Sequence, residues 1–143
     1  MKARMLFLSV PLLLATVVSN GQQAEKTLVK AFNLQGNNAV MLNVGGQAEV
    51  KEWSQSQVRI MMTVTLEQGS EQILKSLVQA GRYNLQSSTE NGLFVISAPG
   101  LEKQIKMSGG KEIRENIHFE IYVPHNVEFK LKDAETEPTT STF

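Results

Sequence analysis

Two histidines and a nearby acid are the first residues to consider, because imidazole and carboxylate groups support general acid–base catalysis and bind metal ions. His118 and His125 could approach each other around a turn, with Glu120 as a third ligand. However, His118 alternates with the apolar residues Ile117 and Phe119, which places it on the solvent face of a strand. The sequence also lacks the Gly-x-Ser-x-Gly and Gly-x-Gly-x-x-Gly motifs of hydrolases and nucleotide-binding loops. We therefore expect no catalytic residues, no metal site and no cofactor.

Trp53 and Met61 are large side chains that the pattern places where a partner could reach them. Trp53 ends a predicted strand and precedes the polar stretch 54–57. An exposed indole there can stack on the ring of a surface glycan, and the alternative is that it anchors the edge of the core. Met61 and Met62 are adjacent, so a strand would direct one thioether to each face. We expect the outer one, Met61, to be covered by a predicted helix or, alternatively, by a partner protein.

The composition excludes several classes of protein. The chain has 143 residues, of which 41% are hydrophobic, and this suits a single domain with a buried core. Its 14 basic residues equal its 14 acidic residues in number, so it lacks the net basic charge that binds nucleic acid. The absence of cysteine rules out disulfides, thiolate metal sites, cysteine nucleophiles and a lipid-modified N-terminal cysteine.

Short runs of alternating apolar and polar residues, separated by Gly, Asn and Ser, predict a mainly β protein. The alternation is clearest over residues 58–66, and it returns over 113–123 and 127–131. We predict an antiparallel β-sandwich or, alternatively, a short β-solenoid-like stack. Hairpin turns are expected at 36–38 and 91–92. The other predicted strands cover residues 27–34, 39–44, 48–53, 83–87, 93–98 and 101–107.

One segment, at residues 71–80, has helical periodicity instead. Ser70 can cap its N-terminus, and Gly81 suits the left-handed conformation that commonly follows a last turn. A helix this short is marginal in isolation, so its apolar stripe must pack on a sheet. We therefore expect one amphipathic helix that lies as a lid over one face. The stripe consists of Ile73, Leu74, Leu77 and Val78.

The two ends of the chain differ from the part between them. Residues 1–21 combine a basic start, an apolar run and the small residues Ser19 and Gly21, which is the pattern of a cleaved secretory signal peptide. Residues 133–143 are acidic and rich in Thr, and we expect a disordered tail there. The folded domain is therefore predicted at 22–132. It would be exported to the periplasm or cell surface of a Gram-negative bacterium, without a stable membrane span after cleavage.

Five segments follow one another in an order that common turn residues do not explain. They are Val-Lys-Glu-Trp at 50–53, Val-Arg-Ile at 58–60, Ala-Gly-Arg-Tyr at 80–83, Leu-Phe-Val-Ile-Ser-Ala-Pro at 93–99 and Phe-Glu-Ile-Tyr-Val-Pro at 119–124. Together they resemble the leading portion of an adhesin-like family of exported bacterial proteins, a domain of unknown function whose members continue into stacked β-strand repeats. This sequence departs from that pattern after Lys132. The resemblance therefore implies an unpaired strand edge near residues 127–131.

Three functions are compatible with these observations. The first is an exported, non-enzymatic domain that acts at the cell envelope through surface or strand-edge contacts with a protein, a second copy of the chain or a surface glycan. The second is a periplasmic module that binds a small ligand in a pocket between the helix and the strand at 58–66. The third, a small hydrolase, lacks the convergent histidine and carboxylate that it would need. The candidate interaction residues are Trp53, Met61, Val127, Phe129 and Leu131.

Overall fold

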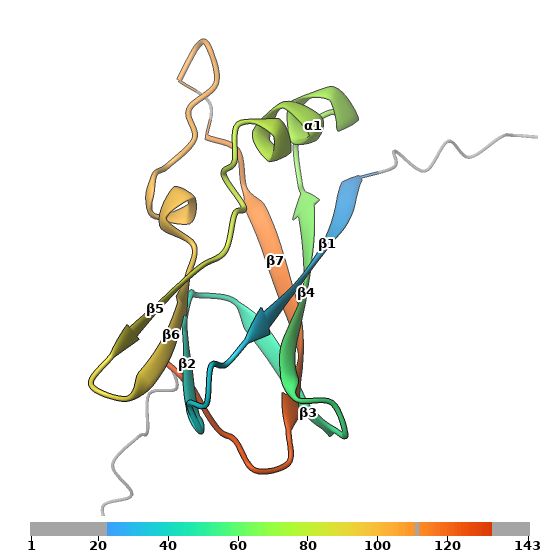
Figure 1. The fold of residues 1–143 in the computed structure, drawn as a ribbon. Coiled ribbons are helices and arrows are strands. Elements are labelled where there is room, and N and C mark those ends of the chain that lie inside the picture. The colour runs from blue at the N-terminus through green and yellow to red at the C-terminus, as the bar shows by residue number, and fades with distance from the viewer. Residues whose placement is uncertain (1–22, 111, 133–143) are drawn as a thin grey trace, which may run out of the picture.

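The computed structural model describes residues 23–110 and 112–132, which form two four-stranded sheets (Figure 1). The predicted signal peptide and the predicted tail lie outside these described residues. The first sheet has the strand order β1 (Ala24–Asn33), β4 (Gln57–Leu66), β7 (Glu115–Pro124), β3 (Gln47–Trp53). The second sheet has the order β5 (Gln86–Glu90), β6 (Leu93–Ser97), β2 (Ala39–Asn43), β8 (Glu128–Leu131).

The predicted β-sandwich is confirmed, and both of its sheets are mixed. β1 with β4, β4 with β7, and β5 with β6 are antiparallel pairs, as predicted. In contrast, β3 with β7, β2 with β6, and β2 with β8 are parallel pairs. Parallel neighbours require crossover connections, and here the chain crosses between the two sheets. Alternation within one strand carries no information about the direction of its neighbour, so this difference was not predictable from it.

Two predicted hairpins have different outcomes. The turn at 91–92 is confirmed, because Asn91 and Gly92 have φ of 52° and 78° and join the paired strands β5 and β6. The turn near 36–38 does reverse the chain, with Gln35 and Gly36 at φ of 52° and 84°. However, the prediction of a hairpin there is wrong, since β1 and β2 belong to different sheets. A tight turn indicates that the chain changes direction, but it does not determine which strand pairs with the strand that follows.

Two strand predictions between the helix and β7 are also wrong in part. The strand expected at 83–87 begins only at Gln86, because the chain leaves α1 through a turn in which the backbone amide of Asn84 donates to the Gly81 carbonyl oxygen at 3.1 Å. The strand expected at 101–107 is replaced by a 3-10 helix, η1 (Pro99–Glu102), and by an isolated bridge between Lys106 and Glu112. Proline at the start of η1 fixes φ near the helical value and supplies no amide donor, which favours a short helical turn over a strand.

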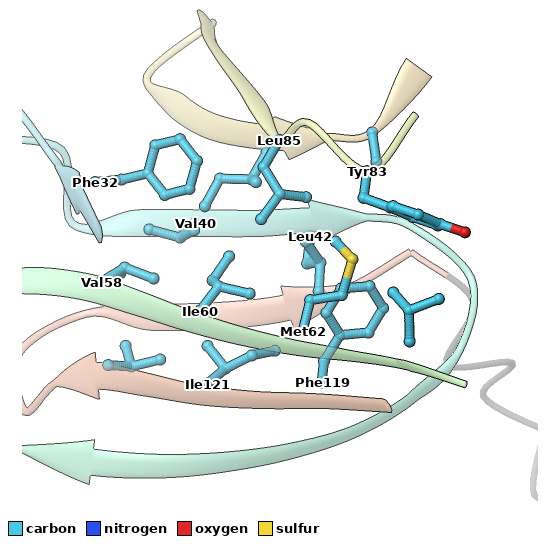
Figure 2. Packing of buried hydrophobic residues seen from close by; sticks show 14 of the residues in the cluster. Phe32, Val40, Leu42, Val58, Ile60, Met62, Tyr83, Leu85, Phe119 and Ile121 are labelled. Carbon is cyan, nitrogen blue, oxygen red and sulfur yellow. The ribbon is translucent and has the colours of Figure 1, made fainter. Parts of the chain in front are cut away.

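The core lies between the sheets and consists of the inner side chains of alternating strands (Figure 2). In β4 every second residue is buried, and the residues between them, Arg59, Met61, Thr63 and Thr65, are part-exposed. β7 follows the same rule, with Phe119 fully buried between the sheets. Among the described residues no polar or charged residue is buried. The most completely buried side chains are Phe119, Leu42, Ile60, Met62, Leu66, Ile96, Ile121, Val40, Val58, Val64 and Val123.

The predicted helix is confirmed as α1 (Glu71–Gln79). The Ser70 hydroxyl accepts a hydrogen bond from the amide of Ile73 at 3.2 Å, and Gly81 follows with φ of 80°. Leu74 is buried, and the rest of the stripe packs on the core at the end of the sandwich where β4 finishes (Figure 1). The helix therefore closes one end of the core, and the expectation that it covers Met61 on the outer face is wrong.

An ion pair joins the segment after α1 to β7. Arg82 Nε lies 2.7 Å from Glu115 Oε1, and both side chains are nearly buried. Arg82 Nη1 also donates to the carbonyl oxygens of Gly100 and Lys103, at 2.7 and 2.6 Å. The adjacent Tyr83 hydroxyl has no hydrogen-bond partner among the described residues. Burial, together with the Glu115 carboxylate, raises the pKa of Tyr83 to about 12, so this phenol stays neutral in the folded protein.

None of the helices in the described part of the chain is long and apolar enough to cross a membrane.

The adjacent residues Met61 and Met62 provide a matched test of this sheet register. Met62 is 1% exposed in the core, whereas Met61 lies on the opposite face of β4. We expect Met62→Ala to lower the free energy of unfolding by about 2–5 kcal/mol, because it leaves a cavity between the sheets. We expect Met61→Ala to change it by no more than about 0.5 kcal/mol. Urea denaturation of both variants measures the difference, and equal losses would contradict the register.

Candidate interaction surface

The outer face of the first sheet carries the most organised group of polar and aromatic side chains in the described structure. We use "outer face" for the side of β4, β7 and β3 that points away from the core. The strand register places Arg59 of β4, Tyr122 of β7 and Lys51 of β3 in one row across this face. The next row contains Met61 and Glu120, and it continues to Glu49 of β3. Residues from three segments thus become neighbours through strand pairing.

Trp53 and Tyr122 form an aromatic pair at one end of this face. Their ring centroids are 5.3 Å apart and their planes are inclined by 39°. The indole Nε1 of Trp53 donates a hydrogen bond to the carbonyl oxygen of Gln57 at 2.8 Å. This bond fixes the ring between the ends of β3 and β4 while leaving it part-exposed. A fixed aromatic ring can make contacts with little loss of conformational entropy.

A polar network orders the second ring of the pair. Lys51 Nζ lies 3.0 Å from Glu120 Oε1 and 5.8 Å from the centroid of the Tyr122 ring. The Tyr122 hydroxyl donates a hydrogen bond to the same carboxylate oxygen. These three residues and Trp53 are called the aromatic cluster below. The charges of Lys51 and Glu120 compensate each other, so the rings of Trp53 and Tyr122 are the part of the cluster available for contact.

The network shifts the pKa of each of its ionisable members. The pKa of Glu120 is lowered, first by the hydrogen bond from Tyr122 and then by the bond from Lys51. The pKa of Lys51 is raised, mainly by its hydrogen bond and charge interaction with Glu120. The pKa of Tyr122 is raised because its hydroxyl proton is held by the same carboxylate. All three shifts favour the protonation states present at neutral pH.

Met61 and Val29 extend the outer face with apolar area. They are directly paired across β4 and β1, and Val29 is 52% exposed. Arg59 lies in the row beside Tyr122, and no acidic side chain forms a salt bridge with it among the described residues. The predicted interaction residues Trp53 and Met61 thus occur on the same face, with exposed apolar and cationic neighbours.

The other three predicted residues do not lie on the outer face. Val127, Phe129 and Leu131 are half-buried and pack against the core, and of these three only Val127 also borders the depression that Trp53 lines at one end of the sandwich. The strand that contains the last two, β8, is at an edge of the second sheet, as the unpaired-edge prediction required. It pairs with β2 only, within the described residues. A partner that binds at this edge would therefore contact the backbone N–H and C=O groups of β8 more than its apolar side chains.

The histidines are not brought together into a site. His125 Nδ1 lies 3.0 Å from Glu52 Oε2 in an exposed pair at the end of β7. His118 is on the outer face, opposite Thr63 of β4. Within residues 23–110 and 112–132, no three His, Cys, Asp or Glu side chains are placed to hold a metal ion.

A small cavity does exist near the position predicted for a ligand pocket. Its volume is about 200 Å³, and Met62 of β4 and Val78 of α1 both line it. β1 forms another wall, and two of the lining residues are joined by a hydrogen bond in which Lys30 Nζ donates to the carbonyl oxygen of Leu85 at 2.6 Å. The cavity is therefore partly enclosed, mostly apolar and close to one cation.

Comparisons with known proteins find little similarity. No family model matches the chain, and no curated protein matches it. A crystal structure of a putative cell adhesion protein from Clostridium sporogenes ATCC 15579 is similar at 12% sequence identity, with a TM-score of 0.39. The similarity covers 75% of this chain and 45% of that one, so this chain spans less than half of that protein. Membership of the adhesin-like family stays a prediction.

The hydrogen bond from Tyr122 makes a testable prediction about Glu120. We expect Tyr122→Phe to raise the pKa of Glu120 toward its ordinary value, because the variant removes the largest cause of the depression. A depressed carboxyl pKa stabilises the folded state above the unfolded pKa, and this contribution disappears as pH falls through the folded pKa. Carboxyl-carbon NMR titration measures the shift. Tyr83→Phe is the matched control, and an unchanged Glu120 in Tyr122→Phe would show that the bond is absent in solution.

Proposed function

We propose that this protein is a non-enzymatic binding domain that is exported and acts at the cell envelope. It contacts its partner through the outer face, with the aromatic cluster at the centre of the contact. One observation carries the proposal: Trp53 and Tyr122 are 5.3 Å apart on a solvent-facing sheet surface, and both are fixed by hydrogen bonds. The predicted signal peptide at residues 1–21 supports export.

The chemistry of the aromatic cluster suits recognition. Trp and Tyr are enriched among the residues that dominate binding energy, because each buries a large area and loses few rotamers. Lys51 and Glu120 satisfy each other at 3.0 Å, so burying them does not create an isolated charge. Arg59 and Met61 surround the cluster with a cation and an apolar side chain. This arrangement has a contact centre and a polar rim on a rigid support.

The face is a better contact site than the edge of the same sheet. β3 is the edge strand beside the cluster, and it carries Glu49, Lys51 and Glu52. Charged side chains on both faces of an edge strand discourage the addition of another strand. Pairing through β5 or β8 would instead bring two copies of the chain together through the second sheet. Sedimentation velocity distinguishes that route, because it requires a concentration-dependent dimer.

Replacing Trp53 tests the proposal directly. The full chain would be expressed in a Gram-negative host, recovered from the periplasm or medium, and mixed with envelope preparations and intact cells. We expect Trp53→Ala to weaken co-sedimentation with the bound fraction at least tenfold, because a central aromatic contact is lost. Trp53→Phe should retain part of the binding, and Ser88→Ala on β5 of the second sheet should retain all of it. Retention in the cytoplasm would contradict export, and equal binding by all variants would contradict the contact site.

A second candidate function, binding of a small apolar ligand, is favoured by the cavity of about 200 Å³ beside Met62 and Val78. The proximity of Lys30 suggests a short-chain carboxylate. If this function holds, hexanoate raises the melting temperature of the wild-type protein by mass action, and hexanol raises it less. Val78→Phe fills the cavity and should remove the response to both compounds. A wild-type melting temperature that is independent of hexanoate would exclude this candidate.

A further inference from the structure

An open, solvent-accessible depression of about 520 Å³ lies at the end of the sandwich opposite α1. Three connections converge around it, at residues 34–38 between β1 and β2, at 54–56 between β3 and β4, and at 125–127 between β7 and β8 (Figure 1). We call it the loop-end cavity. Its volume is in the range of small-molecule sites, and Trp53 forms part of its wall. Val127 lines it as well, so two of the predicted interaction residues meet here.

The lining of the loop-end cavity is rich in side-chain amides and hydroxyls. None of the described residues that line it is Lys, Arg, Asp or Glu. Its one titratable side chain, His125, is paired at 3.0 Å with the carboxylate of Glu52, a residue outside the lining. An uncharged lining gives little attraction for phosphate or carboxylate groups. It is well suited to ligands that carry many hydroxyl groups, because each amide offers both donors and an acceptor. The six lining residues with side-chain amides are Asn33, Gln35, Asn37, Asn38, Gln55 and Asn126.

Part of this polar lining is used to hold the loops in place. Asn33 Oδ1 accepts a hydrogen bond from the backbone N–H of Gln35 at 3.0 Å, and Asn37 Nδ2 donates to the Leu34 carbonyl oxygen at 2.8 Å. The Asn38 carbonyl oxygen accepts from the Glu128 amide at 2.9 Å, which ties the first loop to β8. The cavity wall is therefore already organised, which lowers the entropy lost when a ligand binds.

The remaining polar side chains are available to a ligand. Gln35, Gln55 and Asn126 are exposed, and their side chains form no hydrogen bond with another described residue. Gln35 is held with φ of 52°, an uncommon conformation for a residue other than glycine. Trp53 brings an aromatic surface to the same cavity, and its Nε1 is already bonded to Gln57. The indole therefore contributes apolar ring surface to the site, and the amides contribute directional hydrogen bonds.

We infer that the loop-end cavity binds a neutral carbohydrate, a pyranose or a short chain of them. The apolar C–H side of the sugar ring packs on the Trp53 indole, and Gln35, Gln55 and Asn126 hydrogen-bond to the hydroxyl groups. This inference rests on the proposed function, because Trp53 belongs both to the aromatic cluster and to the cavity, and it specifies the chemical class of the partner. The uncharged lining distinguishes a neutral sugar from an acidic one or a nucleotide.

Tryptophan fluorescence tests this inference without interference, because Trp53 is the one tryptophan in the chain. The purified protein would be titrated with maltotriose, cellotriose and chitotriose, and with tri-galacturonic acid as the acidic comparison. We expect a saturable change in emission with at least one neutral trisaccharide and a weaker response to the acidic one. Nitrogen-15 NMR of the same samples should show shifts in residues of all three loops.

Variants that spare the aromatic cluster locate the binding site. Gln55→Ala and Asn126→Ala should each weaken sugar binding about fivefold or more, whereas Gln86→Ala, an exposed glutamine on β5, should leave it unchanged. Melting temperatures show that each variant is folded. A sugar response that Gln55→Ala and Asn126→Ala do not alter would overturn the assignment to the cavity.

The two proposals can fail separately. If no neutral trisaccharide gives a saturable response while Trp53→Ala still weakens envelope binding, the carbohydrate inference is wrong and the contact face stands. A response to tri-galacturonic acid equal to or stronger than the neutral ones would overturn the inference about the class of sugar. If a neutral sugar binds but envelope binding does not depend on Trp53, the site is confirmed and the proposed contact at the envelope is wrong.

Discussion

Hydrophobic packing of the inner side chains of β4 and β7 is the constraint on which the rest of the structure depends. These strands occupy the centre of the first sheet, and their buried residues fill the space between the sheets. A shift of one residue in either strand would expose Phe119 or Ile60 and bury charged residues, at a cost of several kcal/mol. The same alternation therefore directs Glu120 and Tyr122 outward. The arrangement of side chains on the outer face is thus a geometric consequence of the core.

Much of the fold could be predicted from the sequence where one element has a single strong pattern. The alternation in β4 and β7 and the capped helix α1 depend on local periodicity, which a single sequence is enough to show. Which strands pair with each other could not be predicted from this periodicity. β3 lies beside β7 in a parallel arrangement that no turn between them specifies, and the turn at Gly36 leads from one sheet to the other. The segment 101–107 also has an alternating pattern, but Pro99 and the Arg82 hydrogen bonds hold its start in a helical turn.

The candidate site shows the same division between local and non-local information. Trp53 was identifiable because a large aromatic residue ends a strand beside polar residues. The alternation in β7 places its neighbour Tyr122 on the face opposite Ile121, yet only the pairing of β3 with β7 places the two rings together. The loop-end cavity was less accessible still. Each of its loops is a plausible turn by itself, and they converge because the strands before them end at the same end of the sandwich.

Trp53 connects two surfaces that differ in their electrostatics. On the outer face it lies beside the compensated charges of Lys51 and Glu120, whereas the loop-end cavity that it lines contains no Lys, Arg, Asp or Glu. Binding at the first surface would gain mainly from burial of aromatic area, and this tolerates variation in the partner. Binding at the second would depend on hydrogen bonds whose loss leaves amides unpaired, and this discriminates between ligands that differ by one hydroxyl group. The hydrogen bond from the indole to Gln57 fixes the ring relative to both surfaces, so a ligand that occupied them together would meet a preorganised site.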